Sequence, residues 1–273
     1  MKIALIQQHA THDKAGNIAR GLAALEQAAR SGAALACYAE LAFEWFHPQC
    51  PAEGDVTALA EPIDGPLVDA FQRCARELGI VVVLNFFERE GDRTFDSSPV
   101  IDADGTLLGV TRMIHITEYP CFHEQGYYTP GDQGAPVYQT KAGRVGVSIC
   151  YDRHFPEYMR ALALAGADLV VVPQAGETGE WPEGLYEGEM RVAAFQNGYY
   201  VALCNRVGAE DRLNFGGESF VCAPDGTVIA RAAQGRDDTL YADLDLATAE
   251  RSHARQLFLK HRRPELYAGW LGR

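Results

Sequence analysis

The sequence lacks the residue spacings of common metal and cofactor sites. It contains no C-x-x-C pair and no H-x-x-x-H cluster, which argues against a zinc enzyme. Gly32, Gly91 and Gly105 are scattered turn glycines, so no glycine-rich loop is available to bind a nucleotide phosphate. The local signatures of a papain-type thiol protease are also missing. We therefore expect a protein that uses neither a metal ion nor an organic cofactor.

Long apolar runs and a signal-peptide pattern are absent as well. No apolar stretch is long enough to span a bilayer, and residues 1–7 form a strand-like pattern. Seven cysteines in such a chain predict reduced thiols and a cytoplasmic location. A net charge of −13 argues against nonspecific binding to nucleic acid or to an anionic membrane.

The composition predicts one globular domain over residues 1–273. Hydrophobic residues make up 47% of the chain, which is enough for a sizeable core, and no linker or low-complexity segment divides it. Apolar strand patterns alternate with amphipathic helix patterns, and Asp104-Gly105 and Asp225-Gly226 predict hairpin turns. This order is typical of a layered α/β protein with mixed sheets.

We expect strands at 2–8, 35–38, 80–87, 169–173, 200–205 and 240–244, and helices at 17–31, 66–78 and 184–197. The basic and aromatic C-terminal segment, from about residue 250, is predicted to be an arm that packs on the body or on a partner subunit.

Cys150 is the first candidate catalytic residue. It ends an apolar strand pattern, and Pro156 is well placed to begin the helix that follows. A helix N-terminus and the adjacent Arg153 would both stabilise a thiolate, the reactive form of cysteine. A merely buried cysteine is the alternative interpretation.

Two glutamates are candidate partners of this thiol. Glu40 follows an apolar strand between Ala39 and Leu41, where a carboxylate is costly unless it is paired, hydrogen-bonded or protonated. It is either a general base with a raised pKa or a salt-bridged carboxylate at the rim. Glu124 lies in a loop dense in aromatic residues that ends in a Pro-Gly turn. That loop suits a pocket wall, although a solvated loop carboxylate is equally compatible with the sequence.

Several ordered segments together resemble the nitrilase, or carbon–nitrogen hydrolase, superfamily. Tyr38-Ala-Glu40-Leu resembles its P-E-L segment, and Cys150-Tyr-Asp-Arg-His-Phe-Pro-Glu157 resembles the nucleophile segment of its amidase and N-carbamoyl-amine branches. The loop around Glu124, the stretch from Arg191 to Asn197 and the late hairpin at 215–226 also resemble family segments. The match is spread over nearly the whole length, which makes it more specific than one lone motif.

The resemblance implies a four-layer α-β-β-α sandwich with two mixed sheets, in a homodimer or a higher homo-oligomer. It also implies hydrolysis of an amide or an N-carbamoyl amine through a cysteine thioester. Cys150 would be the nucleophile, Glu40 the base and Glu124 a supporting glutamate. The backbone N–H of Tyr151 would hold the oxyanion together with a lysine.

The sequence departs from the family at that lysine, because Met113 occupies its position. The only lysines are Lys2, Lys14, Lys141 and Lys260, and a thioether offers neither a proton nor a charge. Losing one oxyanion donor typically lowers kcat by about 10²–10³. Three interpretations remain: another donor, with Arg112 and His115 nearest in sequence, fills the gap; a natural branch binds an amide-like ligand with little turnover; or the methionine was introduced to trap substrate.

Loops after the strands are expected to line the substrate pocket. An aromatic bias among the matching segments suggests a substrate with an apolar or planar part. Arg153 could bind a charged substrate end, or it could form a salt bridge that holds the turn after Cys150. The residue types that we expect at the pocket are mainly aromatic: Phe43, Trp45, Tyr119, Phe122, His123, Tyr127, Arg153, Glu177, Trp181 and Tyr186.

Overall fold

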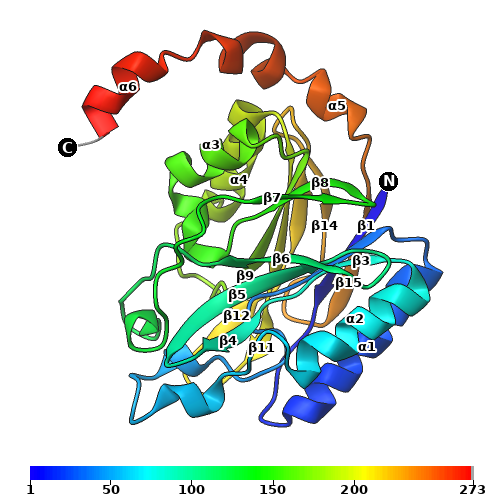
Figure 1. The fold of residues 1–273 in the computed structure, drawn as a ribbon, viewed down its shortest axis with the longest axis vertical. Helices are drawn as coiled ribbons and strands as arrows, with labels where there is room; N and C mark the ends of the chain where they lie inside the picture. Colours follow the sequence, from blue (N-terminus) through cyan, green and yellow to red (C-terminus); the bar gives the residue numbers. More distant parts are fainter. Residues whose placement is uncertain (272–273) are drawn as a thin grey trace.

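The computed structural model describes residues 1–271 and contains two large mixed β-sheets that pack face to face (Figure 1). The seven-stranded sheet has the order β15-β1-β2-β3-β5-β4, with β6 paired to β5. Its strands are β1 (Lys2–Gln7), β2 (Leu35–Tyr38), β3 (Val81–Val83), β4 (Phe86–Glu90), β5 (Arg93–Ile101), β6 (Leu107–Arg112) and β15 (Asp238–Asp243). The six-stranded sheet has the order β14-β13-β10-β9-β8-β7, formed by β7 (Val137–Thr140), β8 (Gly143–Val147), β9 (Leu169–Gln174), β10 (Tyr200–Asn205), β13 (Phe220–Cys222) and β14 (Val228–Arg231). A short ribbon pairs β11 (Val207–Ala209) with β12 (Asn214–Gly216).

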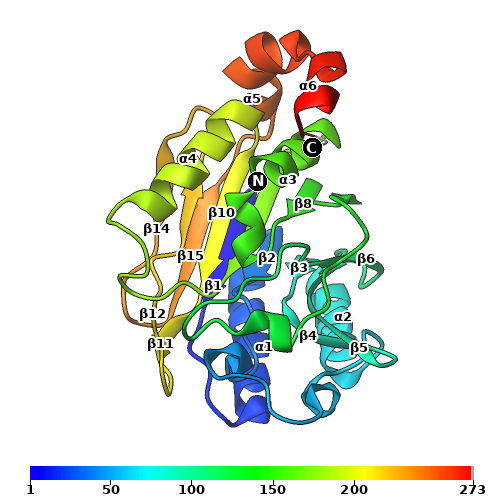
Figure 2. The same ribbon diagram turned by 90° about the vertical axis from the view of Figure 1, so that its left-hand side faces the viewer.

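Helices cover the outer face of each sheet (Figures 1 and 2). The first sheet is covered by α1 (Lys14–Arg30) and α2 (Pro66–Leu78), and the second by α3 (Pro156–Leu164) and α4 (Leu185–Asn197). Buried apolar residues form one cluster between the sheets and one beneath each pair of helices. The predicted four-layer α-β-β-α sandwich is therefore confirmed.

Local sequence explains where these helices begin and end. The Asp13 side chain accepts a hydrogen bond from the Gly16 N–H at 3.0 Å, so α1 begins three residues before the predicted start. Proline begins both α2 and α3, where the missing N–H costs nothing. Gly79 ends α2 with a φ of +68°, a conformation that glycine adopts without strain.

The topology brings several strand ends to one place. Strands β1, β2 and β3 run parallel in the first sheet, and β8, β9 and β10 run parallel in the second. The carboxyl ends of parallel strands lie at the same edge of a sheet, where α/β proteins usually build their sites. Glu40 follows β2, Cys150 follows β8, and Gln174 ends β9. These side chains therefore come from neighbouring strands of two facing sheets.

The single long strand predicted over residues 80–87 is wrong, because the structure divides it into β3 and β4. The break falls at Leu84 and Asn85. The Asn85 side chain accepts from the Leu41 N–H at 2.7 Å and donates to Asp96 Oδ1 at 2.5 Å. A polar side chain that turns inward to bind the loop after β2 therefore interrupts the apolar strand.

The C-terminal segment runs from α5 (Ala247–Glu250) to α6 (Pro264–Leu271) and extends beyond α3 and α4 (Figures 1 and 2). Its first part packs on the body, since Arg255 Nη2 donates to the Ala167 carbonyl at 2.7 Å and the Phe258 ring lies 5.4 Å from that of Phe195. Trp270, in α6, is 63% exposed. Within residues 1–271, none of the helices combines the length and the apolar character needed to cross a bilayer.

Arg206 links the two sheets at the edge where the strands end. It lies between β10 and β11 and is 1% exposed. Its guanidinium donates to the Glu40 carbonyl at 2.9 Å and to the Glu44 carbonyl at 3.1 Å, and it pairs with the buried Glu210. This one side chain therefore holds the backbone that carries Glu40 against the second sheet.

Replacing Arg206 should destabilise the fold strongly. Arg206→Met leaves the buried Glu210 carboxylate and three backbone carbonyls without a partner. Breaking a buried ion pair in this way typically costs about 3–5 kcal/mol. The matched control is Arg73→Met, which breaks an exposed pair with Asp69 and should change stability by less than about 1 kcal/mol. Urea unfolding of both variants measures the difference, and equal losses would contradict the role given to Arg206.

Candidate active site

Cys150 begins a short 3₁₀ turn, Cys150–His154, which is separated from the strand β8 by Ser148 and Ile149. Its φ of +39° is unusual for a non-glycine residue. The side chain is 7% exposed, and Gln174 Nε2 donates a hydrogen bond to Sγ at 3.2 Å. The thiol is thus placed on a strained turn between a strand and the helix α3, as the sequence predicts for a nucleophile.

Glu40 lies fully buried at the end of β2. The next residue, Leu41, has a φ of +44°, and its N–H is held by Asn85. Within the described part of the chain, no N–H group donates to either carboxylate oxygen of Glu40, whose side chain meets those of Asp96 and Cys150. The prediction of a salt-bridged carboxylate at the rim is therefore excluded by the geometry.

Glu124 begins the short 3₁₀ turn Glu124–Gly126 and is also fully buried. The Thr117 N–H donates to Oε2 at 3.3 Å, whereas Oε1 has no hydrogen-bond partner among residues 1–271. Ligand atoms of Glu40, Glu124 and Cys150 all lie within 4.8 Å of one another. Three residues from three distant segments of the sequence thus converge at one point.

Asp96, in β5, adds a third carboxyl group that the sequence analysis missed. It is 1% exposed; Asn85 holds Oδ1, while Oδ2 has no partner among the residues described. The sequence could have revealed Asp96 in the way that it revealed Glu40. An acidic residue within an apolar strand pattern, here between Phe95 and Ser97, is costly to bury unless it has a function.

Burial and neighbouring negative charge raise the pKa values of these groups. Burial, together with the negative charge of Glu124, raises the pKa of Glu40 to about 8. Burial, followed by the charge of Glu40, raises the pKa of Asp96 well above its ordinary range, and burial with Asp96 does the same for Glu124. Burial, Glu40 and Glu124 likewise raise the pKa of the Cys150 thiol. These effects oppose the thiolate that the sequence favours, and they outweigh the lowering effect of Arg153.

Met113 is fully buried and belongs to the same apolar cluster between the sheets as Cys150. Its N–H donates to the Asp96 carbonyl at 2.9 Å, so its backbone pairs with that of β5 at Asp96. Neither sequence neighbour replaces the family lysine. Arg112 pairs with Glu88 and Glu90, and His115 Nδ1 lies 2.6 Å from Asp152 Oδ1.

The two charged residues after Cys150 stabilise the turn and do not pair with each other. The Asp152 carboxylate accepts from the N–H groups of Ile114 and His115 as well as from the His115 ring. Arg153 is buried; it pairs with Glu189 and donates through Nε to Gln174 Oε1 at 2.9 Å. Gln174 in turn donates to the Cys150 sulfur, so Arg153 orients the nucleophile through Gln174. The side chain of Arg153, which the sequence predicted to bind substrate, is thus engaged in an internal hydrogen-bond network.

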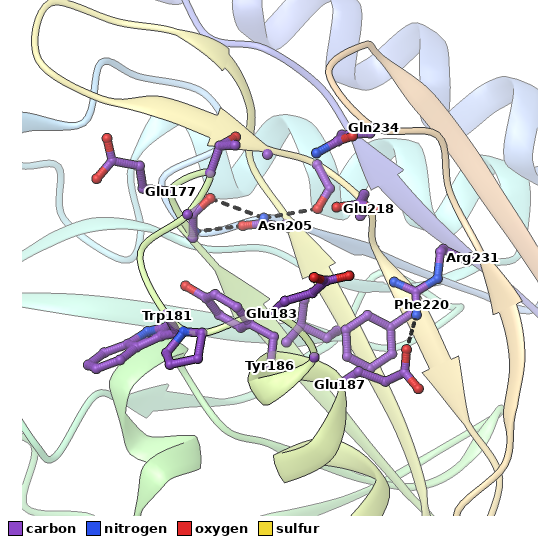
Figure 3. Close-up of a pocket in the computed structure, with 18 residues that line it drawn as sticks. Glu177, Trp181, Glu183, Tyr186, Glu187, Asn205, Glu218, Phe220, Arg231 and Gln234 are labelled. Atoms are coloured by element: carbon purple, nitrogen blue, oxygen red, sulfur yellow. Dashed lines mark hydrogen bonds and ion pairs between the residues drawn. The ribbon is translucent and has the colours of Figure 1, made fainter.

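A cavity of roughly 570 Å³ lies between the segment after β9, the start of α4 and the loop at residues 216–218 (Figure 3), and its lining does not include Glu40, Glu124 or Cys150. Three of the predicted pocket residues, Glu177, Trp181 and Tyr186, line it. Burial and the charge of Glu180 raise the pKa of Tyr186, and the nearby Cys150 adds to this effect. Tyr186 therefore lies near the thiol. Tyr119 hydrogen-bonds to Glu180, as Tyr186 does, so it belongs to the same wall. The segment after β9 therefore forms one side of the site.

The other predicted pocket residues are distributed differently. Phe43 is wrong as a pocket residue: it is fully buried beneath the helices α1 and α2, where its ring packs on Tyr38 and Phe71. Trp45 stacks on His12 at 4.1 Å and lines a separate surface hollow, so it too is not at the cluster. The remaining three lie in or beside the loop that carries Glu124: Phe122 packs on Phe46 and Tyr119, Tyr127 hydrogen-bonds to the Cys50 carbonyl, and His123 contacts Glu118.

The cluster of Glu40, Glu124 and Cys150 offers a metal ion three ligand atoms. Two oxygens and one sulfur could be completed to the four ligands that zinc prefers. Holding zinc would require the deprotonated forms of all three, whereas the raised pKa values favour the protonated forms. The absence of a metal cofactor therefore stays a prediction.

Known proteins resemble this chain over almost its whole length. The family model described as carbon–nitrogen hydrolase matches residues 2–254. An N-carbamoylputrescine amidase of Solanum lycopersicum is 33% identical, covering 97% of this chain and 93% of the relative. A citrullinase of Francisella tularensis is also 33% identical, covering 98% of this chain and 96% of that protein.

Solved structures agree with these relatives. A carbon–nitrogen hydrolase from Helicobacter pylori superimposes with a TM-score of 0.92 at 27% identity, covering 99% of this chain and 98% of that chain. A mutant amidase from Nesterenkonia sp., which carries the acetamide moiety of fluoroacetamide covalently added at its active site cysteine, has a TM-score of 0.83 at 28% identity, with 99% and 96% covered. The matched sequence, the four-layer fold and the convergence of two glutamates on one cysteine lead to the same conclusion: this chain belongs to the carbon–nitrogen hydrolase family.

Proposed function

We propose that this protein hydrolyses the carbon–nitrogen bond of a small amide or N-carbamoyl amine, with Cys150 as the nucleophile and Glu40 as the general base. The observation that carries the proposal is the convergence of Glu40, Glu124 and Cys150 within 4.8 Å in a buried site. The names of the relatives support the substrate class, since N-carbamoylputrescine and citrulline both contain a carbamoyl group bonded to nitrogen.

The first half-reaction forms a thioester. Glu40 takes the proton of the Cys150 thiol, and the sulfur attacks the carbonyl carbon. Because the pKa of Glu40 is raised by burial, its carboxylate is a stronger base than an exposed glutamate would be. The protonated Glu40 then gives the proton to the departing ammonia or amine. Water attacks the thioester in the second half-reaction, with Glu40 again accepting a proton, and the thiol is restored.

The oxyanion of the tetrahedral intermediate has few donors here. The backbone N–H of Tyr151, one residue after the nucleophile, is the donor expected from the geometry of the turn. Met113 contributes no second donor, and loss of one donor lowers kcat by about 10²–10³ in other enzymes. Slow turnover of neutral amides is therefore expected.

A second candidate function follows from Met113. The chain could bind an amide-like ligand without turning it over, because the family lysine is missing while the cavity remains. Against this stands the retention of the nucleophile, the base and the supporting glutamate, none of which is needed for binding alone. Turnover and binding are separated by the measurement of ammonia release described below.

We further propose that the chain acts as one cytoplasmic domain in a homodimer or a higher homo-oligomer, with the segment from about residue 250 as an arm at the subunit interface. Exposed apolar side chains support this proposal, because contiguous apolar surface often marks an interface. They lie on the arm and on the adjacent helix α4: Val192, Phe195, Leu257, Phe258, Leu266 and Trp270.

Covalent labelling should single out Cys150. Fluoroacetamide should add to this thiol at neutral pH, and Glu40→Gln should slow the reaction at least tenfold because the proton acceptor is lost. Intact-mass analysis with peptide mapping measures the site and the rate. Cys74→Ser removes a half-buried thiol on α2 and should leave the adduct unchanged. An adduct that persists in Cys150→Ala at full rate would sink the proposal.

The pH profile should report the buried base. Since Glu40 must be ionised to accept the thiol proton, kcat/KM should increase as the pH rises through about 8. Glu124→Gln removes the neighbouring negative charge and should move this limb to lower pH, whereas the exposed Glu26→Gln should not. Initial rates of ammonia release over a pH series provide the profile. A limb near 4.5, the ordinary value for glutamate, would show that the base is not buried in the working enzyme.

Charge placed on the arm should disrupt assembly. The double variant Leu257→Asp and Trp270→Asp removes two exposed apolar side chains that we place at the interface. Light scattering during size exclusion should give at least twice the mass of one chain for the unmodified protein and a lower mass for this variant. Ile229→Asp, at an exposed site on β14, serves as the control and should not change the mass. A monomeric unmodified protein would refute the proposed assembly.

A further inference from the structure

The hydrogen bonds of Asn85 assign an acceptor role to one oxygen of Asp96. The Leu41 N–H donates to Asn85 Oδ1 at 2.7 Å, so the amide nitrogen of Asn85 points the other way, to β5. That nitrogen donates to Asp96 Oδ1 at 2.5 Å and to Ser98 Oγ at 3.1 Å. Because an amide nitrogen only donates, any proton that Asp96 carries must lie on its other oxygen, Oδ2.

Oδ2 of Asp96 is the oxygen left to face Glu40. The two side chains meet, and the Glu40 side chain also meets that of Cys150. Both carboxyl groups are at most 1% exposed, and among residues 1–271 no N–H group donates to Asp96 Oδ2 or to either oxygen of Glu40. Two carboxylates in such contact cannot both be ionised, because no water screens their repulsion. A proton between them removes the repulsion and satisfies acceptors that are otherwise costly to bury.

The other donors near Glu40 do not bond to it. Arg206 acts on Glu40 through its charge, but its N–H groups bond to backbone carbonyls and to another carboxylate. The Tyr128 hydroxyl is buried close to Asp96 and Glu40, yet it has no hydrogen-bond partner within the described part of the chain. Asp96 is therefore the side chain best placed to donate a hydrogen bond to the Glu40 carboxylate.

The remaining charges around this pair are negative and favour a retained proton. Burial and then the charge of Glu124 raise the pKa of Glu40, whereas burial, Glu40 and Asp152 raise the pKa of Asp96. The hydrogen bond between the two carboxyl groups acts in opposite directions on them. It lowers the pKa of Glu40 and raises that of Asp96, so the proton stays with Asp96 when Glu40 ionises.

We infer that Asp96 is a positioning residue, a neutral carboxylic acid whose Oδ2–H donates to the Glu40 carboxylate and orients it towards the Cys150 thiol. The inference rests on the proposed function, because it assumes that Glu40 is the general base. One proton moves in the attack step, from the thiol to Glu40, while Asp96 keeps its own proton throughout.

This donor has a consequence for the base. Burial disfavours the ionised form of Glu40, and a hydrogen bond to that form favours it again. Donation from Asp96 therefore brings the pKa of Glu40 down towards neutrality. Met113 offers neither a proton nor a charge for this purpose. Asp96 thus supports the ionised base with a hydrogen bond, in a site where no cation bonds to Glu40 among the residues described.

Two substitutions of Asp96 separate hydrogen-bond donation from packing. Asp96→Asn keeps a donor, because Asn85 bonds to the oxygen of the new amide and leaves its N–H groups facing Glu40. Asp96→Leu has a similar volume and no donor. The rate of fluoroacetamide addition to Cys150 is measured by intact mass over a pH series. In Asp96→Leu the limb that reports Glu40 should move up by about one pH unit or more, with addition about tenfold slower at neutral pH. In Asp96→Asn the limb should stay at or below its position in the unmodified protein.

Tyr128→Phe is the matched control for these variants. It removes a buried hydroxyl close to the same carboxyl groups and should leave the limb in place, because this hydroxyl has no hydrogen-bond partner among residues 1–271. Infrared spectra make the test independent of whether Asp96→Leu folds. Above the pH of the limb, the unmodified protein should retain a carboxylic acid band that Asp96→Asn lacks.

An unmoved limb in Asp96→Leu overturns the inference. So does an upward shift in Asp96→Asn or in Tyr128→Phe as large as that in Asp96→Leu, or a carboxylic acid band that Asp96→Asn leaves unchanged. Each of these results would leave the proposed function standing as long as Glu40→Gln still slows the addition, whereas a Cys150 thiol that does not react would remove both.

Discussion

The burial of three carboxyl groups around one thiol, without a cation bonded to them, is the constraint that dominates this structure. Glu40, Asp96 and Glu124 are shielded from water, so each raises the energy of its neighbours' ionised forms. Burial, with the charges of Glu40 and Glu124, also raises the pKa of the Cys150 thiol. Reactivity must then come from proton transfer during attack, and the base is strong because its charged form is disfavoured.

The fold sustains this arrangement by holding several strand ends together. Arg206 ties the backbone of Glu40 to the second sheet, and Asn85 ties the loop after β2 to Asp96. On the other side, Arg153 orients Gln174, which bonds to the Cys150 sulfur. Buried polar networks of this kind cost stability unless every member is satisfied. Here most members are satisfied, whereas among residues 1–271 no N–H group donates to the carboxylate oxygens of Glu40 or to Oε1 of Glu124.

The sequence allowed the layers and the nucleophile to be predicted because both depend on local patterns. Apolar strands, Pro156 at a helix start and the motif around Cys150 are all readable from neighbouring residues. Contacts between distant segments were not readable. Arg206 bonds to the carbonyls of Glu40 and Glu44, 166 and 162 positions away in the sequence. Phe43 lies beneath the helices α1 and α2, away from the expected pocket. The thiolate that the sequence favours was inferred from the nearby Arg153 without the two distant glutamates, whose charges raise the pKa of the buried thiol.

The central claim is that the buried carboxyl groups at Glu40, Asp96 and Glu124 retain protons at neutral pH. Infrared difference spectroscopy between the unmodified protein and Asp96→Asn measures this directly, because a protonated carboxylic acid and a carboxylate absorb at separate frequencies. The account predicts a carboxylic acid band at pH 7 that is altered by this substitution and weakens as the pH is raised. Spectra that contain only carboxylate bands for these residues at pH 7 would contradict it.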